Sequence, residues 1–127
     1  MSKKVLIIED NQAEGMAITN MVIQGGFTAI RAEDGVGGLA KIKSDKPDLV
    51  LLDIILPKMT GYDVLSHVKN DPQLKQIPII VLTNLTQGDE AQKSFSLGAA
   101  DHLIKTNITP TELITKIKNN LKNGKKK

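Results

Sequence analysis

Short, unbroken apolar runs recur along this chain. They cover residues 5–8, 49–52, 79–82 and 102–104, and a weaker extended segment covers residues 28–32. Strands buried on both faces of a sheet carry such continuous Val, Ile and Leu runs, whereas strands exposed on one face alternate apolar and polar residues. The pattern therefore predicts five strands of a parallel sheet.

The segments between these strands show helical spacing. Apolar residues repeat at helical intervals across 17–22, 64–68 and 113–121. The last of these helices has a clear beginning, because Thr-Pro-Thr-Glu at 109–112 is a capping box with proline at the first helical position. Strands that alternate with helices predict right-handed crossovers and helices on both faces of the sheet.

Glycines mark the ends and the weak points of the helices. Gly25, Gly26 and Gly98 lie where the C-terminal caps of two helices belong. Gly37 and Gly38 fall inside the second helical segment, where each costs about 1 kcal/mol relative to alanine. These two glycines weaken the prediction of a helix there.

The composition is that of one globular domain. The chain has 127 residues, of which 40% are hydrophobic and 24% charged. We expect residues 1–121 to form a single domain and residues 122–127 a disordered basic tail. The net charge of +3 comes from lysines at the two ends, since residues 5–121 hold 11 cations against all 14 acids. With few and dispersed aromatic residues as well, direct nucleic-acid binding is not indicated.

Cysteine is absent from the chain, which excludes a disulfide scaffold, thiolate metal sites and thiol catalysis. The first apolar run ends at Glu9 and Asp10 and is too short for the core of a signal peptide. No segment approaches the run of about 18 apolar residues that a membrane span needs. We therefore expect a cytoplasmic protein without membrane insertion.

Polar residues follow the strands at their carboxyl ends. Glu9 and Asp10 follow the first strand, Asp53 follows the third, Thr83 ends the fourth, and Lys105 follows the fifth. In open α/β sheets, ligands bind outside the carboxyl ends of the strands where the strand order reverses; for the order 2-1-3-4-5 this lies between strands one and three. We expect the three acids to converge on one crevice, with Thr83 and Lys105 on its far side.

Such a cluster of acids needs a cation. At an effective dielectric constant of about 20, two carboxylates about 4 Å apart repel by about 4 kcal/mol. Lys105 supplies one positive charge, and a hard divalent ion held by one or two carboxylates and by water is the pattern of Mg²⁺. The alternative is that the strand-end acids cap helices and stay solvated.

The chain resembles the receiver domain of two-component response regulators, of the stand-alone chemotaxis type. The resemblance covers about residues 3–121. It rests on Glu9, Asp10, Asp53 with Pro57 and Gly61 after it, Thr83 and Lys105. The spacings of 43 residues from Asp10 to Asp53, 30 to Thr83 and 22 to Lys105 are those that the family uses. The fold expected is α/β: a three-layer, doubly wound (βα)5 flavodoxin-like fold with a five-stranded parallel sheet in the order 2-1-3-4-5.

The resemblance also implies a set of roles. It makes Asp53 the acceptor of a phosphoryl group from a sensor histidine kinase or a histidine phosphotransfer protein. Lys105 then pairs with the phosphoryl group, and Thr83 donates a hydrogen bond to it. Such proteins are signalling switches rather than turnover enzymes. The implied ligands of Mg²⁺, with Mn²⁺ as a substitute, are Glu9, Asp10, Asp53 and the backbone carbonyl of Ile55.

Thr83 and His102 are the candidate switch residues. In the family, the threonine moves toward the phosphoryl group and vacates space that a ring from the fifth strand enters. The family usually places Tyr or Phe at that position; here it holds His102, whose charge titrates near neutral pH. The alternative is a solvated histidine of an edge strand. His67, in the middle of a helix, is expected to be an ordinary surface residue.

Three departures from the family pattern concern the site. The family usually follows its lysine with a cis-proline; Thr106 stands there, and a cis bond before a non-proline residue costs about 3–4 kcal/mol. Asn84 replaces a very small residue and narrows access to Asp53. Ile55 and Leu85 occupy positions from which polar side chains orient an attacking water. Because apolar side chains cannot do this, we predict a slowly hydrolysed aspartyl phosphate.

The resemblance places the output surface on the fourth helix, the fifth strand and the fifth helix. With no effector domain expected, the output is a separate, unknown protein. One alternative is a degenerate receiver that acts only as an unphosphorylated interaction module. Another is an enzyme of flavodoxin-like fold, which the lack of a P-loop and of a glycine-rich dinucleotide turn opposes. The candidate output contacts are Lys93, Ser94, His102 and Lys116.

Overall fold

The computed structural model describes residues 2–85 and 88–124, in which five strands alternate with five helices. The strands are β1 (Lys4–Ile8), β2 (Thr28–Ala32), β3 (Leu49–Leu52), β4 (Ile79–Thr83) and β5 (Asp101–Ile104). The helices are α1 (Gln12–Gln24), α2 (Gly35–Asp45), α3 (Gly61–Lys69), α4 (Glu90–Ser96) and α5 (Pro110–Gly124). This alternation confirms the prediction from the hydrophobic pattern.

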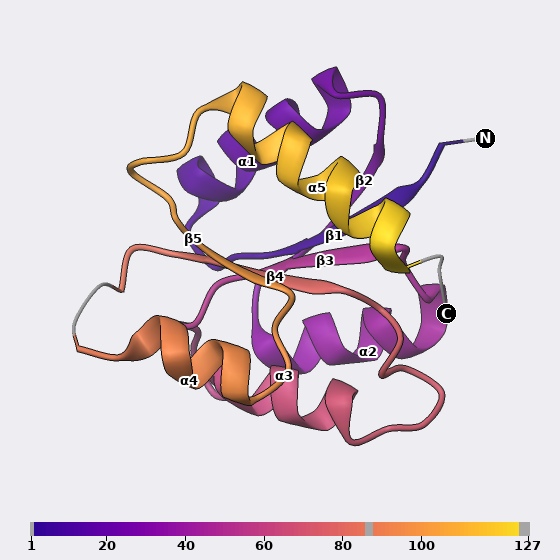
Figure 1. Ribbon diagram of the computed structural model, residues 1–127, viewed down its shortest axis with the longest axis vertical. Helices are drawn as coiled ribbons and strands as arrows, with labels where there is room; N and C mark the ends of the chain where they lie inside the picture. The colour runs from indigo at the N-terminus through magenta and orange to yellow at the C-terminus, as the bar shows by residue number, and fades with distance from the viewer. Residues whose placement is uncertain (1, 86–87, 125–127) are drawn as a thin grey trace.

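All five strands are parallel and form one sheet in the order β2-β1-β3-β4-β5. Figure 1 shows α1 and α5 on one face of the sheet and α2, α3 and α4 on the other. The predicted three-layer flavodoxin-like architecture is therefore confirmed. Because the order reverses between β1 and β3, the chain leaves these strands toward opposite faces, and a crevice opens between them at their carboxyl ends.

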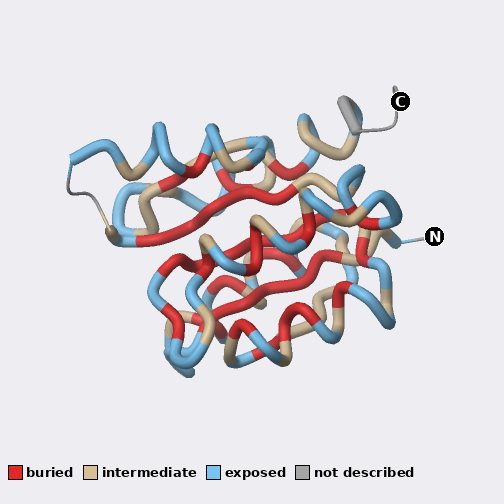
Figure 2. The backbone as a smooth tube through the Cα atoms, turned by 90° about the horizontal axis from the view of Figure 1, so that it is seen from below, coloured by how far each residue is buried: buried red, intermediate tan, exposed pale blue. Residues whose placement is uncertain are grey.

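Alternate residues of the central strands supply the two halves of the core. In β1, Leu6 and Ile8 belong to the half that includes residues of α2 and α3, whereas Val5 and Ile7 pack with residues of α1 and α5. The same alternation runs through β3 and β4. Figure 2 shows the result, with buried backbone through the centre and exposed residues on the outer turns of the helices. Burial on both faces explains why the strands read as unbroken apolar runs.

The helix ends carry the caps that the sequence indicates. At the start of α5, the N–H of Thr109 donates to the Glu112 carboxylate and the N–H of Glu112 donates to Thr109 Oγ1, each over 3.1 Å. Gly25 caps α1, and Gly98, just after α4, has a φ of 106°. Glycine adopts this left-handed conformation without the steric cost that a side chain brings.

α2 forms in spite of its two internal glycines. A Cβ on Gly38 would lie 2.5 Å from Cδ1 of Ile8, so the missing side chain lets the helix pack closely on β1. Asp34 caps the helix by accepting a hydrogen bond of 2.6 Å from the N–H of Gly37. Tertiary contact and the cap therefore offset the low helix propensity of glycine.

α5 continues to Gly124, so the helix takes up the first three residues of the tail that we expected to begin at residue 122. The sequence from 111 to 123 contains no proline or glycine that would end the helix before Gly124. Residues 125–127, also part of the predicted tail, lie outside the described residues. Over residues 2–85 and 88–124, no helix is both long and apolar enough to cross a membrane.

Candidate functional site

Glu9, Asp10 and Asp53 converge at the carboxyl ends of β1 and β3, as the strand order predicts. One carboxylate oxygen from each residue lies within 4.8 Å of the others. The backbone fixes this approach, because the N–H of Glu9 donates to the carbonyl of Ala32 (3.0 Å) and the N–H of Asp53 to that of Ile8 (3.1 Å). Glu9 and Asp53 are buried, with 2% and 5% of their surface exposed, whereas Asp10 is exposed. The crevice therefore joins two buried carboxylates to a third that faces solvent.

The ammonium group of Lys105 enters this cluster from the loop after β5. Its Nζ donates to Glu9 Oε1 (2.6 Å) and to Asp53 Oδ2 (2.9 Å), and it also donates to the carboxylate of Glu14. The loop is held in place because the N–H of Lys105 donates to the carbonyl of Thr83 (3.0 Å). Glu14 was not predicted from the sequence; its position in the first turn of α1, beside the acidic pair, is the signal that could have revealed it.

The charges in the crevice are unevenly compensated. Burial raises the pKa of Glu9, although a hydrogen bond from Lys105 and one of 3.0 Å from the N–H of Asn11 favour its ionised form. Burial by itself lowers the pKa of Lys105, but hydrogen bonds to Glu14, Glu9 and Asp53 outweigh it and hold that pKa above the usual range. The lysine is charged, and the carboxylates around it outnumber it.

Arg31 on β2 is a second residue that the sequence analysis missed. Its Nη2 donates to the carbonyls of Glu9 (3.1 Å) and Asn11 (3.3 Å), so the guanidinium group holds the loop that carries the acidic pair. Gly15 makes room for it, because a Cβ at that position would lie 2.3 Å from Nε of Arg31. Asn11 in turn caps α1 by accepting a 2.9 Å hydrogen bond from the N–H of Glu14. Contacts to main-chain carbonyls leave no pattern in the sequence, so only the structure reveals this support.

The loop after β3 brings the beginning of α3 against Asp53. The N–H of Gly61 donates to the carbonyl of Ile54 (2.9 Å), and a Cβ on Gly61 would lie 2.2 Å from the carbonyl oxygen of Asp53. Glycine is required by this close approach. The N–H of Ile55 donates to Asp53 Oδ1 (3.3 Å), and Ile55 is 58% exposed. The role of the Ile55 carbonyl as a metal ligand stays a prediction.

The end of β4 and the loop after β5 are joined by side chains. Thr83 is fully buried, and its Oγ1 accepts a hydrogen bond of 3.3 Å from the N–H of Leu85. Asn84 Oδ1 accepts one of 3.0 Å from the N–H of Thr106. The Lys105–Thr106 bond is trans, since no cis peptide bond occurs among the described residues. Two departures from the family pattern therefore contact each other. Thr106 has an N–H that a proline lacks, and Asn84 accepts a hydrogen bond from it.

His102 on β5 is half-buried, and its Nδ1 lies 2.9 Å from Oγ of Ser94 on α4. Burial lowers the pKa of His102, while the charges of Glu90 and Asp101 act in the opposite direction. Ser94 is fully buried, so its expected role as an exposed contact of the output surface is wrong. The physical reason is that its side of α4 packs toward β5. His67 is exposed on α3, as expected.

The donors in the crevice fit a hard divalent cation. Carboxylate oxygens are the ligands that Mg²⁺ prefers, and the acids outnumber the lysine charge that lies among them. Within residues 2–85 and 88–124, the three acids are the one group of side chains placed closely enough to share an ion. The residues that would hold Mg²⁺ are Glu9, Asp10 and Asp53.

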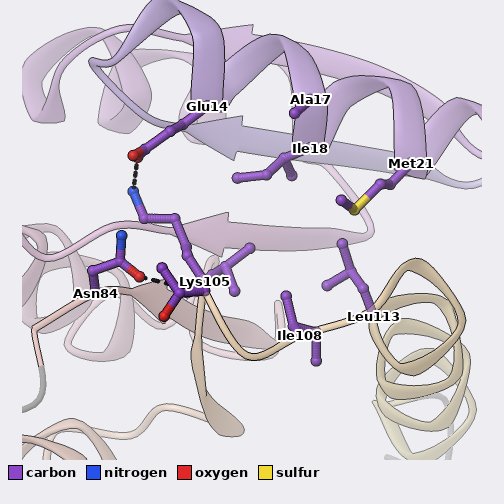
Figure 3. Close-up of a pocket in the computed structure, with 10 residues that line it drawn as sticks. Glu14, Ala17, Ile18, Met21, Asn84, Lys105, Ile108 and Leu113 are labelled. Carbon is purple, nitrogen blue, oxygen red and sulfur yellow. Dashed lines mark hydrogen bonds and ion pairs between the residues drawn. The ribbon is translucent and has the colours of Figure 1, made fainter.

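An apolar cavity of about 180 Å³ adjoins the crevice (Figure 3). It lies between α1 and the segment that runs from β5 into α5. Figure 3 shows Lys105 reaching across the rim of this cavity toward Glu14 on α1, with Asn84 on the other side. Its apolar lining includes Ala17, Ile18, Met21, Ile108 and Leu113.

Comparison with known proteins identifies the family to which this chain belongs. Residues 5–118 match the family model of the response regulator receiver domain. The chain belongs to this family. It is 32% identical over 122 residues to the polar-differentiation response regulator DivK of Brucella anthropi, with 95% of this chain and 98% of DivK covered.

Two further relatives agree with this assignment. The crystal structure of a CheY-like response regulator receiver domain protein from Methanospirillum hungatei superposes with a TM-score of 0.90 at 27% identity, covering 99% of this chain and 98% of that one. The phosphate regulon transcriptional regulatory protein PhoB of Escherichia coli is 29% identical over 118 residues, which are 93% of this chain. The chain spans only about half the length of PhoB, 51%.

Proposed function

We propose that the protein is a phosphorylation-dependent signalling switch that accepts a phosphoryl group on Asp53. The observation that carries this proposal is the position of Asp53: its carboxylate is buried, held by the Lys105 ammonium at 2.9 Å, and clustered with Glu9 and Asp10. A buried acid with an adjacent cation and two further acids suits a nucleophile that works beside a metal ion. Membership of the receiver family supports the same role.

The reaction that these residues support is transfer of a phosphoryl group from a phosphohistidine. An oxygen of the Asp53 carboxylate attacks phosphorus, an O–P bond forms, and the N–P bond breaks with its electron pair going to the donor imidazole. Lys105 is placed to neutralise charge on the transferred group, because its Nζ already contacts the acceptor carboxylate. When bound by Glu9, Asp10 and Asp53, Mg²⁺ supplies additional positive charge to the phosphoryl oxygens. Mn²⁺ is proposed as a substitute, and the Ile55 carbonyl as a further ligand.

The switch that follows phosphorylation uses Thr83 and His102. The Thr83 hydroxyl, at the end of β4, donates to the new phosphoryl group and gives up its hydrogen bond from the N–H of Leu85. His102 then moves relative to Ser94, its partner on α4. The two side chains stand on neighbouring strands, since Thr83 pairs with Ile104 and His102 lies two residues before it. The changed surface is that of α4, β5 and α5, with Lys93, His102 and Lys116 as candidate contacts.

The proposal is tested with a small phosphodonor. Incubation with acetyl phosphate and Mg²⁺ is expected to add one phosphoryl group, seen as a mass gain, to the natural chain and not to Asp53→Asn. Asp45→Asn is the matched control. It removes a carboxylate at the C-terminal end of α2, away from the crevice, and is expected to be phosphorylated normally. Absence of the mass gain in the natural chain would leave the degenerate receiver, an unphosphorylated interaction module, as the function.

The lifetime of the phosphorylated form is a second test. Ile55 and Leu85 flank the site with apolar side chains, the first 58% exposed and the second packed against the core. Neither can hold a water in line with the Asp53–phosphoryl bond, so we predict hydrolysis over minutes or longer rather than seconds. Ile55→Glu is expected to shorten the lifetime, because a carboxylate there can orient water; a half-life of seconds in the natural chain would contradict the prediction.

The partners proposed are a sensor histidine kinase or histidine phosphotransfer protein as donor and a separate protein as target, in the cytoplasm. We propose neither direct nucleic-acid binding nor membrane insertion. A comparison of the proteins captured by the phosphorylated natural chain and by Asp53→Asn identifies the target. A target that binds both equally would contradict control by phosphorylation.

A further inference from the structure

Glu14 differs from the other two carboxylates that share the Lys105 ammonium. Glu9 and Asp53 have side chains that are 2% and 6% exposed, whereas the side chain of Glu14 is 43% exposed. Glu14 belongs to α1 rather than to a strand end, and it is not one of the three acids close enough to share an ion. It is therefore a partner of the lysine that stands outside the candidate metal cluster.

The lysine and a metal ion share two carboxylates, those of Glu9 and Asp53. Nζ of Lys105 lies 2.6 Å from Glu9 Oε1 and 2.9 Å from Asp53 Oδ2, and both residues belong to the acid cluster. A divalent cation bound there would repel the ammonium group strongly over such distances. Binding of the ion is therefore expected to weaken the contact of the ammonium group with these two acids.

The surroundings restrict where the ammonium group can turn. Figure 3 shows the Lys105 side chain extended along the rim of the cavity, with Glu14 directly ahead of its Nζ. Much of the nearby lining on α1 and α5 is apolar, as with Ile18, Met21 and Leu113. Such side chains offer an ammonium group no hydrogen bond, so a carboxylate at this edge has a large influence on its position.

We propose that Glu14 is a positioning residue that receives the Lys105 ammonium when a divalent cation occupies the acid cluster. Glu14 holds the ammonium group at the edge of the cluster and near Asp53, and this attraction leaves oxygens of Glu9 and Asp53 free for the ion. The inference rests on the proposed function, because it assumes that the cluster binds Mg²⁺. It adds a residue that the resemblance to the family does not assign.

The affinity for Mg²⁺ tests this role without any measurement of phosphorylation. Titration of the natural chain with MgCl2, followed by calorimetry or by the amide resonances of the loop after β1, gives the Kd. In Glu14→Gln the lysine keeps only Glu9 and Asp53 as partners, so Kd is expected to rise about three-fold, the size typical of a partly exposed ion pair. Glu33 is an exposed acid just after β2, and Glu33→Gln is the matched control. It is expected to leave Kd within about 1.5-fold of the value for the natural chain.

Two further variants distinguish an effect of Glu14 on Kd that acts through Lys105 from a direct effect of its negative charge on the ion. In a Lys105→Met background, Glu14→Gln is expected to change Kd by less than about 1.5-fold, because no ammonium group remains to be drawn away. Glu14→Asp keeps the charge but shortens the side chain, and it is expected to weaken Mg²⁺ binding as Glu14→Gln does. An equal effect of Glu14→Gln with and without the lysine, or natural affinity in Glu14→Asp, would overturn the inference.

The result also distinguishes the inference from the proposed function. If the natural chain binds no Mg²⁺, the proposed function fails. If the natural chain binds Mg²⁺ and Glu14→Gln binds it equally well, the proposed function stands and the role of Glu14 fails. Far-ultraviolet circular dichroism of each variant verifies that it is folded before titration.

Discussion

The acid cluster at the ends of β1 and β3 and the neighbouring region of β4, β5 and α4 form two sides of the molecule that are built from different chemistry. On one side, which we call the acidic side, Glu9, Asp10 and Asp53 stand at the ends of β1 and β3. On the other, which we call the hydroxyl side, Thr83 ends β4 and Ser94 on α4 meets His102 on β5. Among the described residues, the buried polar side chains are Glu9, Asp53, Thr83 and Ser94, two on each side.

The difference lies in how each side satisfies its buried groups. The carboxylates of the acidic side share one ammonium group, so their charge is incompletely balanced. The hydroxyl groups are neutral and have local partners: Thr83 accepts from the N–H of Leu85, and Ser94 is 2.9 Å from His102. Removal of a partner is therefore expected to cost much on the acidic side and little on the hydroxyl side. Because its contacts are neutral and weak, the hydroxyl side is also the side whose side chains can rearrange.

The largest expected effect comes from removal of the lysine. Lys105→Met leaves two buried carboxylates without their cation and is expected to lower the free energy of unfolding by about 3 kcal/mol in EDTA. Urea denaturation measures this loss, and added Mg²⁺ is expected to recover part of it. Lys116→Met is the matched control; its partly exposed pair with Asp101 spans 3.5 Å, so a change below about 1 kcal/mol is expected. An equal loss of unfolding free energy in the two variants would contradict the proposed difference between the two sides.

A second effect on the acidic side concerns the support of the loop after β1. Gly15→Ala places a Cβ 2.3 Å from Nε of Arg31 and displaces its hydrogen bonds to the carbonyls of Glu9 and Asn11. The free energy of unfolding is expected to fall by about 1–2 kcal/mol. In an Arg31→Ala background the same change is expected to stabilise the protein by about 1 kcal/mol, because alanine has the higher helix propensity. Destabilisation of equal size in both backgrounds would contradict this account of Gly15.

A smaller effect is expected where the hydroxyl side meets the loop after β5. Asn84→Ala removes the acceptor of the Thr106 N–H and is expected to cost about 1 kcal/mol. Hydrogen exchange at the Thr106 amide should accelerate, while exchange at the amide of Lys105, which donates to the carbonyl of Thr83, should change less. Unchanged exchange at Thr106 would show that Asn84 does not hold the loop.

The smallest expected effect is the pH dependence that arises from His102. Because burial lowers the pKa of His102 in the folded protein, the fold favours the neutral ring. Its contribution to stability is complete above the unfolded pKa of about 6.5 and declines as the pH falls from there toward the folded pKa. Urea midpoints measured between about pH 5 and pH 8 test this. His102→Gln should remove the decline, while His67→Gln, exposed on α3, should retain it.

The order of the elements could be predicted from the sequence because each element buries its residues in a repetitive way. The unbroken runs of β1, β3 and β4 reflect burial on both faces, and the capping box at Thr109 and Glu112 marks the start of α5 locally. The end of α5 could not be predicted so well, because no proline or glycine before Gly124 marks where the helix stops. The buried position of Ser94 also escaped prediction, since seven-residue α4 is too short to show a clear periodicity.

The fold class and the acids of the crevice could be predicted from the residues alone, because in a parallel sheet the residues that follow neighbouring strands meet at one edge. How the acids are held and how their charge is balanced became clear only from the folded arrangement. Arg31 and Asn84 act on main-chain groups far away in the chain, and Glu14 meets Lys105 across 91 residues. Contacts of this kind depend on where loops and helix ends come together in space, and no periodic pattern along the chain records them.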